Sequence, residues 1–531
     1  MSGRQSKDMY NRKIIGRRKE CERLEECLRE DNAQLIIVYG RRRVGKTFLI
    51  NEFFDNQFAF KLTGAFNQSR DFQLRNFAAE YRRKAAEYNR KYSEYGREAS
   101  EYSCEASDYS RKASDYSRKG ADNMESARMN GKQPRLSDWT EAFELLRAYL
   151  EQLPKDEKQV VFFDEMPWLD TQKSGFLPAF EWFWNDWAST QSNLVFIVCG
   201  SATSWMVDNI ANNKGGLFNR HTCRLYLEPF KLFETEAFLE SKNINWSRYE
   251  IAECYMVMGG IPYYLNLLSS RLSYRQNIDR LFFEKKGELW DEFGHLYQTL
   301  FSNTDNYIKV VEALSRKSSG LTRNEIVNST GLSGNGNLTK ILNDLTASGF
   351  VRVSGFYGKK TKNAIYQLAD YYTAFYFRYI KDRYGKDEHF WSNTIDNPSR
   401  RAWAGLTFEQ LCKDHISQIK HKLGISGVLT EESVWYTQGD EELGISGAQI
   451  DMLIERRDRV INLCEMKFSI NEFMIDKAYD AVLRNKVDSF RKATNCKKTL
   501  QMTMITTYGV KKNKYSGFVQ SEVTLDDLFH S

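Results

Sequence analysis

The sequence predicts an α/β fold with a doubly wound parallel sheet in its N-terminal half. Three short apolar runs rich in β-branched and aromatic residues, 35–39, 159–163 and 194–199, are typical of buried strands, and helical stretches separate them. This alternation favours a parallel sheet with helices on both faces. Because 531 residues are too many for one hydrophobic core, further domains are expected to follow.

Composition and cysteine usage limit the class of protein. Apolar residues make up 41% and charged residues 27% of the chain, no apolar run is long enough to span a membrane, and the first residues lack a signal-peptide apolar region. Nine cysteines occur without paired spacing or a Cys/His cluster, which predicts reduced thiols, no zinc site and a cytoplasmic location. The net charge of +6 permits contact with nucleic acid without demanding it.

The first predicted strand runs directly into a phosphate-binding sequence. It reads Gly40-Arg41-Arg42-Arg43-Val44-Gly45-Lys46-Thr47, which fits G-x-x-x-x-G-K-[ST], and an amphipathic helix is predicted over 47–54. Such a loop wraps its backbone N–H groups around phosphates. Lys46 is expected to reach the β- and γ-phosphates of ATP, and the Thr47 hydroxyl to hold Mg²⁺. A chance match in a turn is the alternative, and the flanking strand and helix argue against it.

Polar residues follow the second and third predicted strands. Asp164 and Glu165 end the second strand, where an acid would hold Mg²⁺ through water and its neighbour would act as general base. Ser201 ends the third strand and can orient water or the γ-phosphate. The alternative for the acidic pair is a solvated cap on the next turn.

Taken together, these motifs resemble the prokaryotic AAA-like or STAND-type ATPases known as the archaeal ATPase family. The matching features are Ile15-Gly16-Arg17 with Glu20, the phosphate-binding loop, Phe163-Asp164-Glu165, Gly200-Ser201, Leu217-Phe218-Asn219-Arg220 and Gly259-Gly260-Ile261-Pro262. The resemblance implies a P-loop NTPase with Gly16, Arg17 and Pro262 near the adenine. It also implies that Arg220 contacts the γ-phosphate, in the same chain or from a neighbouring one. Without the resemblance, Arg220 would be interpreted as a surface or structural arginine. Likewise, the residues Gly259, Gly260 and Pro262 would predict only a helix stop and turn.

A heptad pattern interrupts the predicted ATPase domain. From Tyr81 to Tyr116 a tyrosine occurs every seven residues, and a second series from Ala85 to Gly120, mostly alanine, is offset by three or four positions. This pattern predicts a long amphipathic helix over 81–121. It is either a self-associating coiled coil or a solvent-exposed arm expanded by tandem duplication.

The middle of the chain predicts helices followed by a winged helix. Residues 229–303 are helical in pattern and resemble the lid of the same family. Helices over 307–314, 322–329 and 338–348 precede a hairpin over 350–353 and 364–368, with a lysine-rich tip at 358–362. This module either contacts DNA phosphates through Lys340 and the tip or serves as an internal packing module, because the face with Asn337, Thr339, Lys340, Asn343 and Asp344 is only weakly basic.

The C-terminal part places two carboxylates and a lysine on one predicted hairpin. Runs 448–454 and 460–467 read as its strands, and a loop centred on Asp458 would set Asp451 opposite Glu465, with Lys467 on the same face. Facing carboxylates repel unless a cation lies between them, so this set suits Mg²⁺ and phosphodiester chemistry. Glu409, on a helix predicted over 407–422, could complete the cluster. A cross-strand salt-bridge cluster is the alternative.

The hairpin resembles the PD-(D/E)xK phosphodiesterase fold, which is also called restriction-endonuclease-like, although Gln449-Ile450 replaces the usual proline before the first acid. The predicted domains are therefore an ATPase core (1–80 and 122–228), the heptad insertion (81–121), a helical lid (229–303), a winged helix (304–385) and a nuclease-like domain (386–531). The predicted function is an ATPase that controls a DNA-acting, Mg²⁺-dependent domain. The alternatives are a regulatory switch that binds DNA or protein without cleaving, and an assembly module. The ATPase domain or the heptad arm would mediate any homo-oligomer.

Overall fold

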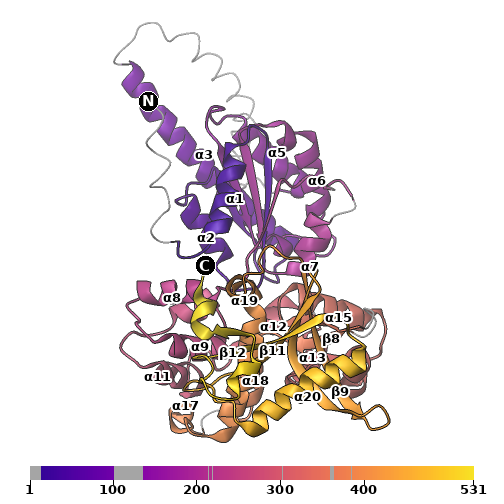
Figure 1. Ribbon diagram of the computed structural model, residues 1–531. Coiled ribbons are helices and arrows are strands. Elements are labelled where there is room, and N and C mark those ends of the chain that lie inside the picture. The colour runs from indigo at the N-terminus through magenta and orange to yellow at the C-terminus, as the bar shows by residue number, and fades with distance from the viewer. Residues whose placement is uncertain are drawn as a thin grey trace, which may run out of the picture. The chain divides into compact units, whose positions relative to one another are not determined.

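The computed structural model describes residues 14–100, 136–212, 215–217, 219–301, 303–358, 364–383 and 386–531 (Figure 1). By its internal contacts the chain forms two compact units. The first comprises Met1–Gly40 and Lys46–Leu227, and the second comprises Arg41–Gly45 and Glu228–Ser531. Within the described helices, none is both long and apolar enough to cross a membrane. The cysteines that the structure describes are all free thiols, as predicted.

The first unit contains a five-stranded parallel sheet in the order β2-β3-β4-β1-β5. Three strands were predicted: β1 (Gln34–Tyr39), β3 (Gln159–Asp164) and β4 (Leu194–Gly200). The edge strands β2 (Phe60–Thr63) and β5 (Cys223–Tyr226) were not. Each has only four residues and alternates buried and more exposed positions, so neither gives a continuous apolar run.

Helices of the first unit pack on this sheet through a core rich in aromatic side chains. These helices include α1 (Arg18–Arg29), α2 (Lys46–Phe53), α5 (Trp139–Leu150) and α6 (Phe176–Asp186). Phe143 of α5 stacks on Phe163 of β3 with ring centroids 6.0 Å apart, and Phe180 of α6 lies 5.2 Å from Phe196 of β4. Burial of these faces stabilises the sheet whose carboxyl edge holds the site.

The first heptads pack against this core, in a helix that begins before the predicted start of the insertion at residue 81. Helix α3 (Arg70–Ser100) begins well before that point. Tyr81 and Tyr88 both pack edge-on against Tyr149 of α5, and the Tyr88 hydroxyl donates a hydrogen bond of 2.8 Å to the Gln152 carbonyl. Burial raises the pKa of Tyr149 to about 12. The tyrosines from Tyr95 onward lie outside the residues whose side chains the structure describes.

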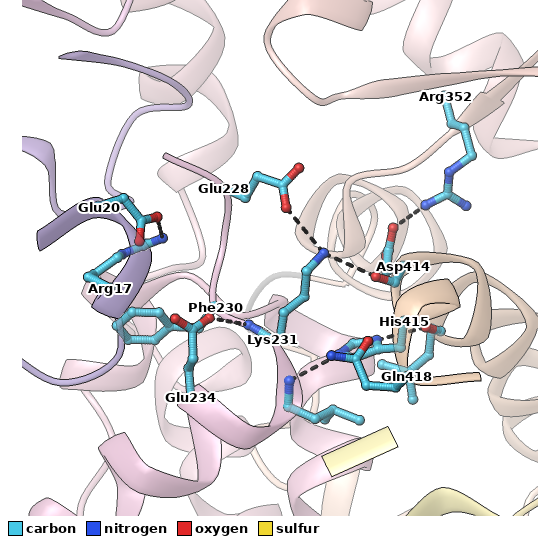
Figure 2. Close-up of polar contacts among 12 residues, drawn as sticks. Arg17, Glu20, Glu228, Phe230, Lys231, Glu234, Arg352, Asp414, His415 and Gln418 are labelled. Carbon is cyan, nitrogen blue, oxygen red and sulfur yellow. Dashed lines mark hydrogen bonds and ion pairs between the residues drawn. The ribbon is translucent and has the colours of Figure 1, made fainter. Parts of the chain in front are cut away.

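The second unit begins with helices and ends in a mixed eight-stranded sheet. Its helices include α8 (Leu232–Ser241), α9 (Arg248–Met258), α10 (Pro262–Asn266), α11 (Tyr274–Ile278) and α12 (Glu292–Leu300), as the pattern predicted. Figure 2 shows polar contacts near the start of this unit. Lys231 forms an ion pair with Glu228 and donates a hydrogen bond to the Asp414 carbonyl, while buried His415 accepts one from the Leu232 N–H.

Three helices and a hairpin follow close to their predicted positions. The helices are α13 (Thr304–Ser315), α14 (Arg323–Thr330) and α15 (Gly336–Ala347), and the hairpin pairs β7 (Val351–Phe356) with β8 (Ile365–Leu368). Asp344 corrects the predicted polar face of α15, because it is buried and accepts a hydrogen bond of 2.5 Å from Tyr307. Lys359 to Lys362 at the tip lie outside the described residues.

The C-terminal strands continue the sheet of this hairpin, so the predicted winged helix (304–385) and the predicted C-terminal domain (386–531) share one sheet. The strand order is β13-β12-β11-β10-β9-β7-β8-β6, where β6 is the short strand Leu321–Thr322, and β7 pairs in parallel with β9 (Thr430–Asp440). Strands β10 (Ile445–Arg456), β11 (Val460–Lys467), β12 (Thr499–Thr506) and β13 (Ser521–Thr524) complete it. Helix α20 (Lys477–Thr494) packs against β10, and α18 (Pro398–Asp414) packs against β11 (Figure 1). The helix predicted over 407–422 is instead the end of α18 followed by α19 (Ile416–Lys422).

Candidate functional site

The phosphate-binding loop joins β1 to α2, and its shape depends on glycine at both ends. Gly40 has φ +142°, and a Cβ there would lie 2.4 Å from the Leu227 carbonyl oxygen. Gly45 has φ +89°, in the region that L side chains rarely adopt. Arg43, between them, also has a positive φ of 72°. The loop therefore has the conformation in which successive N–H groups can face an anion.

Lys46 lies at the centre of a buried hydrogen-bond chain in the first unit. Its ammonium donates to the Gly40 carbonyl at 2.9 Å and to the Ser201 hydroxyl at 3.0 Å. Ser201 in turn donates to Glu165, from its hydroxyl at 2.6 Å and from its backbone N–H at 3.1 Å. The fold thus brings together Lys46, Glu165 and Ser201, which are the residues that the sequence predicted for phosphate binding and water activation.

A second pair of residues is suited to Mg²⁺. The Thr47 hydroxyl donates to the Asp164 carboxylate at 2.8 Å, and Asp164 also accepts from the Glu165 N–H at 3.0 Å. A hydroxyl and a carboxylate are hard oxygen ligands, which Mg²⁺ prefers. The donor set therefore fits the ion that ATP would bring. Glu165 adopts a left-handed backbone conformation, with φ 48°, which accompanies the turn of its side chain toward Ser201.

The remaining residues predicted for nucleotide binding are placed by local structure. Gly16 and Arg17 have φ 66° and 59°, and buried Arg17 forms an ion pair of 3.4 Å with Glu20 (Figure 2). Pro262 opens α10, and a Cβ at Gly260 would lie 2.0 Å from the Phe230 carbonyl oxygen. Arg220 has an exposed side chain in the turn before β5, and within the described residues no ion pair holds it. The structure does not bring Arg220 into the hydrogen-bond chain of Lys46.

Two arginines of the loop form ion pairs inside the second unit. Arg41 forms a buried ion pair with Asp370 and lies 4.8 Å from the Phe350 ring. Arg43 forms an ion pair of 2.5 Å with Glu292 and lies 4.2 Å from the Tyr263 ring. Val44 is buried, whereas Arg42 is only partly buried. Neither Asp370 nor Glu292 was predicted, because ion-pair partners distant in sequence cannot be found from spacing.

The C-terminal hairpin has the predicted register. Met452 pairs with Cys464 and Glu455 with Ile461, so the loop is centred on Asp458 and Asp451 lies opposite Glu465. A β-bulge between Ile450 and Leu453 interrupts the pairing of β10 with β9 at Asp451. Bulges are common beside active sites, because they redirect one side chain. Here Asp451 accepts a hydrogen bond of 3.0 Å from the Met466 N–H.

Buried Glu465 is held by three donors rather than left to repel Asp451. Lys467 pairs with one of its oxygens at 2.9 Å, Lys486 pairs with the other at 2.5 Å, and the Tyr479 hydroxyl donates at 2.7 Å. Burial alone would raise the pKa of Glu465, but the two lysines outweigh it and lower the pKa. Tyr479 and Lys486 were not predicted. Their spacing of seven residues, one face of α20, is the signal that could have found them.

Burial has the opposite outcome for the other two carboxyl groups. It raises the pKa of Asp451, with Glu465 as the second cause, and it raises the pKa of Glu409 to about 7, with Asp451 as the second cause. Within the described residues, no group of three or more His, Cys, Asp or Glu side chains is arranged to hold a metal ion. In this conformation lysines supply the positive charge that the sequence assigned to Mg²⁺.

Glu409→Gln is expected to change the pH dependence of stability. A carboxyl whose pKa is raised on folding contributes stability at low pH, and this contribution is lost as pH rises from about 4.5 to about 7. Over this pH window, the free energy of unfolding of Glu409→Gln should therefore fall by about 1–3 kcal/mol less than that of the wild type. Urea unfolding at pH 5, 6, 7 and 8 in EDTA measures it, with exposed Glu441→Gln as control. Equal slopes for wild type and Glu409→Gln would contradict the prediction.

Comparison with known proteins agrees with the nucleotide site. Residues 14–268 match the profile of a family described as an ATPase domain predominantly from Archaea. An uncharacterized protein of Methanocaldococcus jannaschii is 23% identical over 432 residues, which are 81% of this chain and 83% of that one. An uncharacterized ATP-binding protein of the same organism is 54% identical over 44 residues, which are 8% of this chain and 75% of that one.

Solved structures that resemble this chain include the following two. The Walker-type ATPase of Pyrococcus abyssi has a TM-score of 0.46 and 18% identity, over 69% of this chain and 96% of that one. The ORC2 protein of Aeropyrum pernix, in ADPNP and ADP complexes, has a TM-score of 0.37 and 12% identity, over 71% of this chain and 97% of that one. Residues 14–268, which contain the phosphate-binding loop described above, are thus similar to this family of ATPase domains.

Proposed function

We propose that this protein binds ATP with Mg²⁺ and hydrolyses it. The hydrogen-bond chain Lys46–Ser201–Glu165 carries the proposal, because it links the lysine expected to bind phosphate to a carboxylate able to accept a proton from water. Mg²⁺, held by Thr47 and Asp164, would neutralise charge on the phosphates. Lys46 would exchange its present acceptors for phosphate oxygens. Gly16, Arg17 and Pro262 are proposed to lie near the adenine, and Arg220 to contact the γ-phosphate in the same chain or from a neighbouring one.

We further propose that the nucleotide controls the second unit. Arg41 and Arg43 belong to the loop that would wrap the phosphates, and they hold Asp370 and Glu292 through ion pairs. A change of loop conformation on ATP binding would therefore act directly on these acids. A buried ion pair broken on one side is costly, by about 3–5 kcal/mol, so even a small displacement would favour a different arrangement.

The controlled part would act on DNA. Residues 304–368 have the helix order and hairpin of a winged helix, with exposed Asn337, Thr339, Lys340 and Asn343 on α15. The bulged acid Asp451, the facing Glu465 and Lys467 support a PD-(D/E)xK phosphodiesterase site, with Glu409 as a further carboxylate. Metal bound there would activate water and stabilise charge on phosphate.

A regulatory switch without cleavage is the second candidate function. The three donors on Glu465 favour it, because a carboxylate already neutralised by Lys467 and Lys486 has less need of a metal ion. In this alternative the second unit binds DNA or a protein. Homo-oligomers through the ATPase domain or the heptad arm are compatible with both candidates.

Glu165→Gln is expected to retain ATP binding and lose turnover. The amide can still accept a hydrogen bond from Ser201 but cannot take a proton from water, and general-base catalysis contributes roughly 10²–10⁴-fold. Phosphate release under saturating ATP measures turnover, and fluorescent ATP analogue titration measures binding. Glu181→Gln, in α6 of the same unit, is the matched control. Wild-type turnover in Glu165→Gln would exclude Glu165 as the base.

A further inference from the structure

A cavity of about 240 Å³ lies in the second unit, and its lining includes no residue of the phosphate-binding loop. One wall is a face of α18, where Ser399, Ala402, Trp403, Leu406, Gln410 and Lys413 recur at helical spacing. The opposite walls come from the end of α13, the hairpin strands β7 and β8, and the helical turn that carries Arg378. Within the site described above, only Glu409 also lines this cavity.

The charges on the cavity wall are mostly positive. Of the four lining cations, Arg316 is paired with Glu312 at 3.0 Å, and Arg352 is paired with Asp414 (Figure 2). Arg378 donates a hydrogen bond of 2.8 Å to the Ser399 hydroxyl and has no ion pair within the described chain. Lys413 has neither a hydrogen bond nor an ion pair to any residue that the structure describes, and it does not reach Glu409 four residues earlier on α18.

Burial lowers the pKa of Lys413, although the negative charge of Glu409 opposes this shift. A partly desolvated ammonium that no carboxylate of the described residues contacts directly is unfavourable. An anion in the cavity would offset this cost and would also find the Arg378 guanidinium, whose planar donors match a phosphate or carboxylate. The same cavity offers an apolar side through Trp403, Leu406 and Leu368. Its ligand should therefore have an anionic end and a flat or apolar end.

We propose that this cavity binds a phosphate monoester of about mononucleotide size, with Lys413 and Arg378 on the phosphate and Trp403 beside the base. The volume lies just below the range of about 300–1,000 Å³ typical of small-molecule pockets, so a larger nucleotide would fit only in part. The phosphate belongs either to a free nucleotide or to the 5′ end of a nucleic-acid strand. The proposal does not depend on ATP hydrolysis or on cleavage by the Asp451 cluster.

Calorimetric titration of the full chain tests this proposal. The background variant Lys46→Ala removes phosphate binding at the loop, and the probes are cytidine 5′-monophosphate, cytidine, and a short oligodeoxycytidylate with a 5′-phosphate or a 5′-hydroxyl. The variants are Lys413→Met and Arg378→Met. Arg401→Met is the control, because Arg401 is exposed on α18 and paired with Asp396 outside the cavity.

We expect the monophosphate to bind and cytidine not to bind. Lys413→Met and Arg378→Met should each weaken binding about tenfold or more, as the loss of a charged hydrogen bond implies, while Arg401→Met leaves it unchanged. If the 5′-phosphorylated strand binds more tightly than its 5′-hydroxyl form, the ligand is the end of a nucleic-acid strand. If only the monophosphate binds, the ligand is a free nucleotide. The melting temperature of Lys413→Met should be no lower than that of the background variant, because the substitution removes a buried charge. If Lys413→Met does not fold, Lys413→Gln is used in its place. The proposal is wrong if no phosphorylated probe binds, or if both cavity variants bind as the control does.

Discussion

Lys46→Ala is expected to abolish ATP binding at ATP concentrations close to the dissociation constant of the wild type. The ammonium is buried, and its acceptors include the Gly40 carbonyl and the Ser201 hydroxyl. Losing charged hydrogen bonds to two phosphate groups should cost about 3 kcal/mol or more, which is a factor of more than about a hundred in affinity. Fluorescent ATP analogue titration with Mg²⁺ measures the change.

The matched control is Lys158→Ala. Lys158 precedes β3 at the amino end of the strand, away from the loop, and binds only backbone carbonyls there. It should retain wild-type affinity. Wild-type binding and hydrolysis in Lys46→Ala would show that the loop is not the nucleotide site, and the similarity to the ATPase family would then describe only the fold.

Glu465→Gln is expected to separate a phosphodiesterase site from a salt-bridge cluster. In a metal site the substitution removes Mn²⁺-dependent stabilisation and DNA cleavage, while ATP hydrolysis continues. From the sequence alone, neutralising one of two facing acids would leave metal-free stability equal or higher. The structure reverses that expectation. Glu465 balances Lys467 and Lys486, so its loss should destabilise the metal-free protein by roughly 3 kcal/mol, as breaking a buried pair does.

Melting curves in EDTA and in Mn²⁺ measure both effects. The wild type and Glu465→Gln should carry Lys46→Ala in this experiment, because the loop also binds metal. Glu455, which lies on the same hairpin, provides the matched control. Glu455→Gln breaks its partly exposed ion pair with Lys498. Plasmid cleavage is assayed in parallel with intact Lys46. If Mn²⁺ stabilises both proteins equally and the wild type cuts no plasmid, the cluster is structural and the regulatory switch is the better proposal.

The pH dependence of the same cluster follows from opposite pKa shifts. The lowered pKa of Glu465 contributes stability above pH 4.5 that is lost as pH falls, whereas the raised pKa of Glu409 contributes stability at low pH that is lost toward pH 7. The two carboxyl groups therefore affect the free energy of unfolding in different pH windows. Measurements at pH 5 and above report mainly on Glu409.

Most residues of the candidate nucleotide site could be grouped from the sequence, because this candidate site is built at strand ends. Parallel strands end at one edge of a sheet, so Lys46, Asp164 and Ser201 must meet once β1, β3 and β4 are recognised. The hairpin around Asp458 was predictable for a similar reason, since antiparallel pairing across a short loop fixes the register of Asp451 and Glu465. In both cases local patterns determine long-range geometry.

By itself, the sequence determined the parallel sheet, the phosphate-binding loop, the order of helices in the second unit and the register of the C-terminal hairpin. Only the tertiary structure decided that Tyr81 and Tyr88 pack against the core and that β7 joins β9 in one sheet. It alone also supplied Lys486 and Tyr479 to Glu465, and placed Lys413 in the wall of a cavity. The physical reason is that strand and helix periodicity are encoded locally, whereas the charge and burial of a side chain depend on which distant residues pack around it.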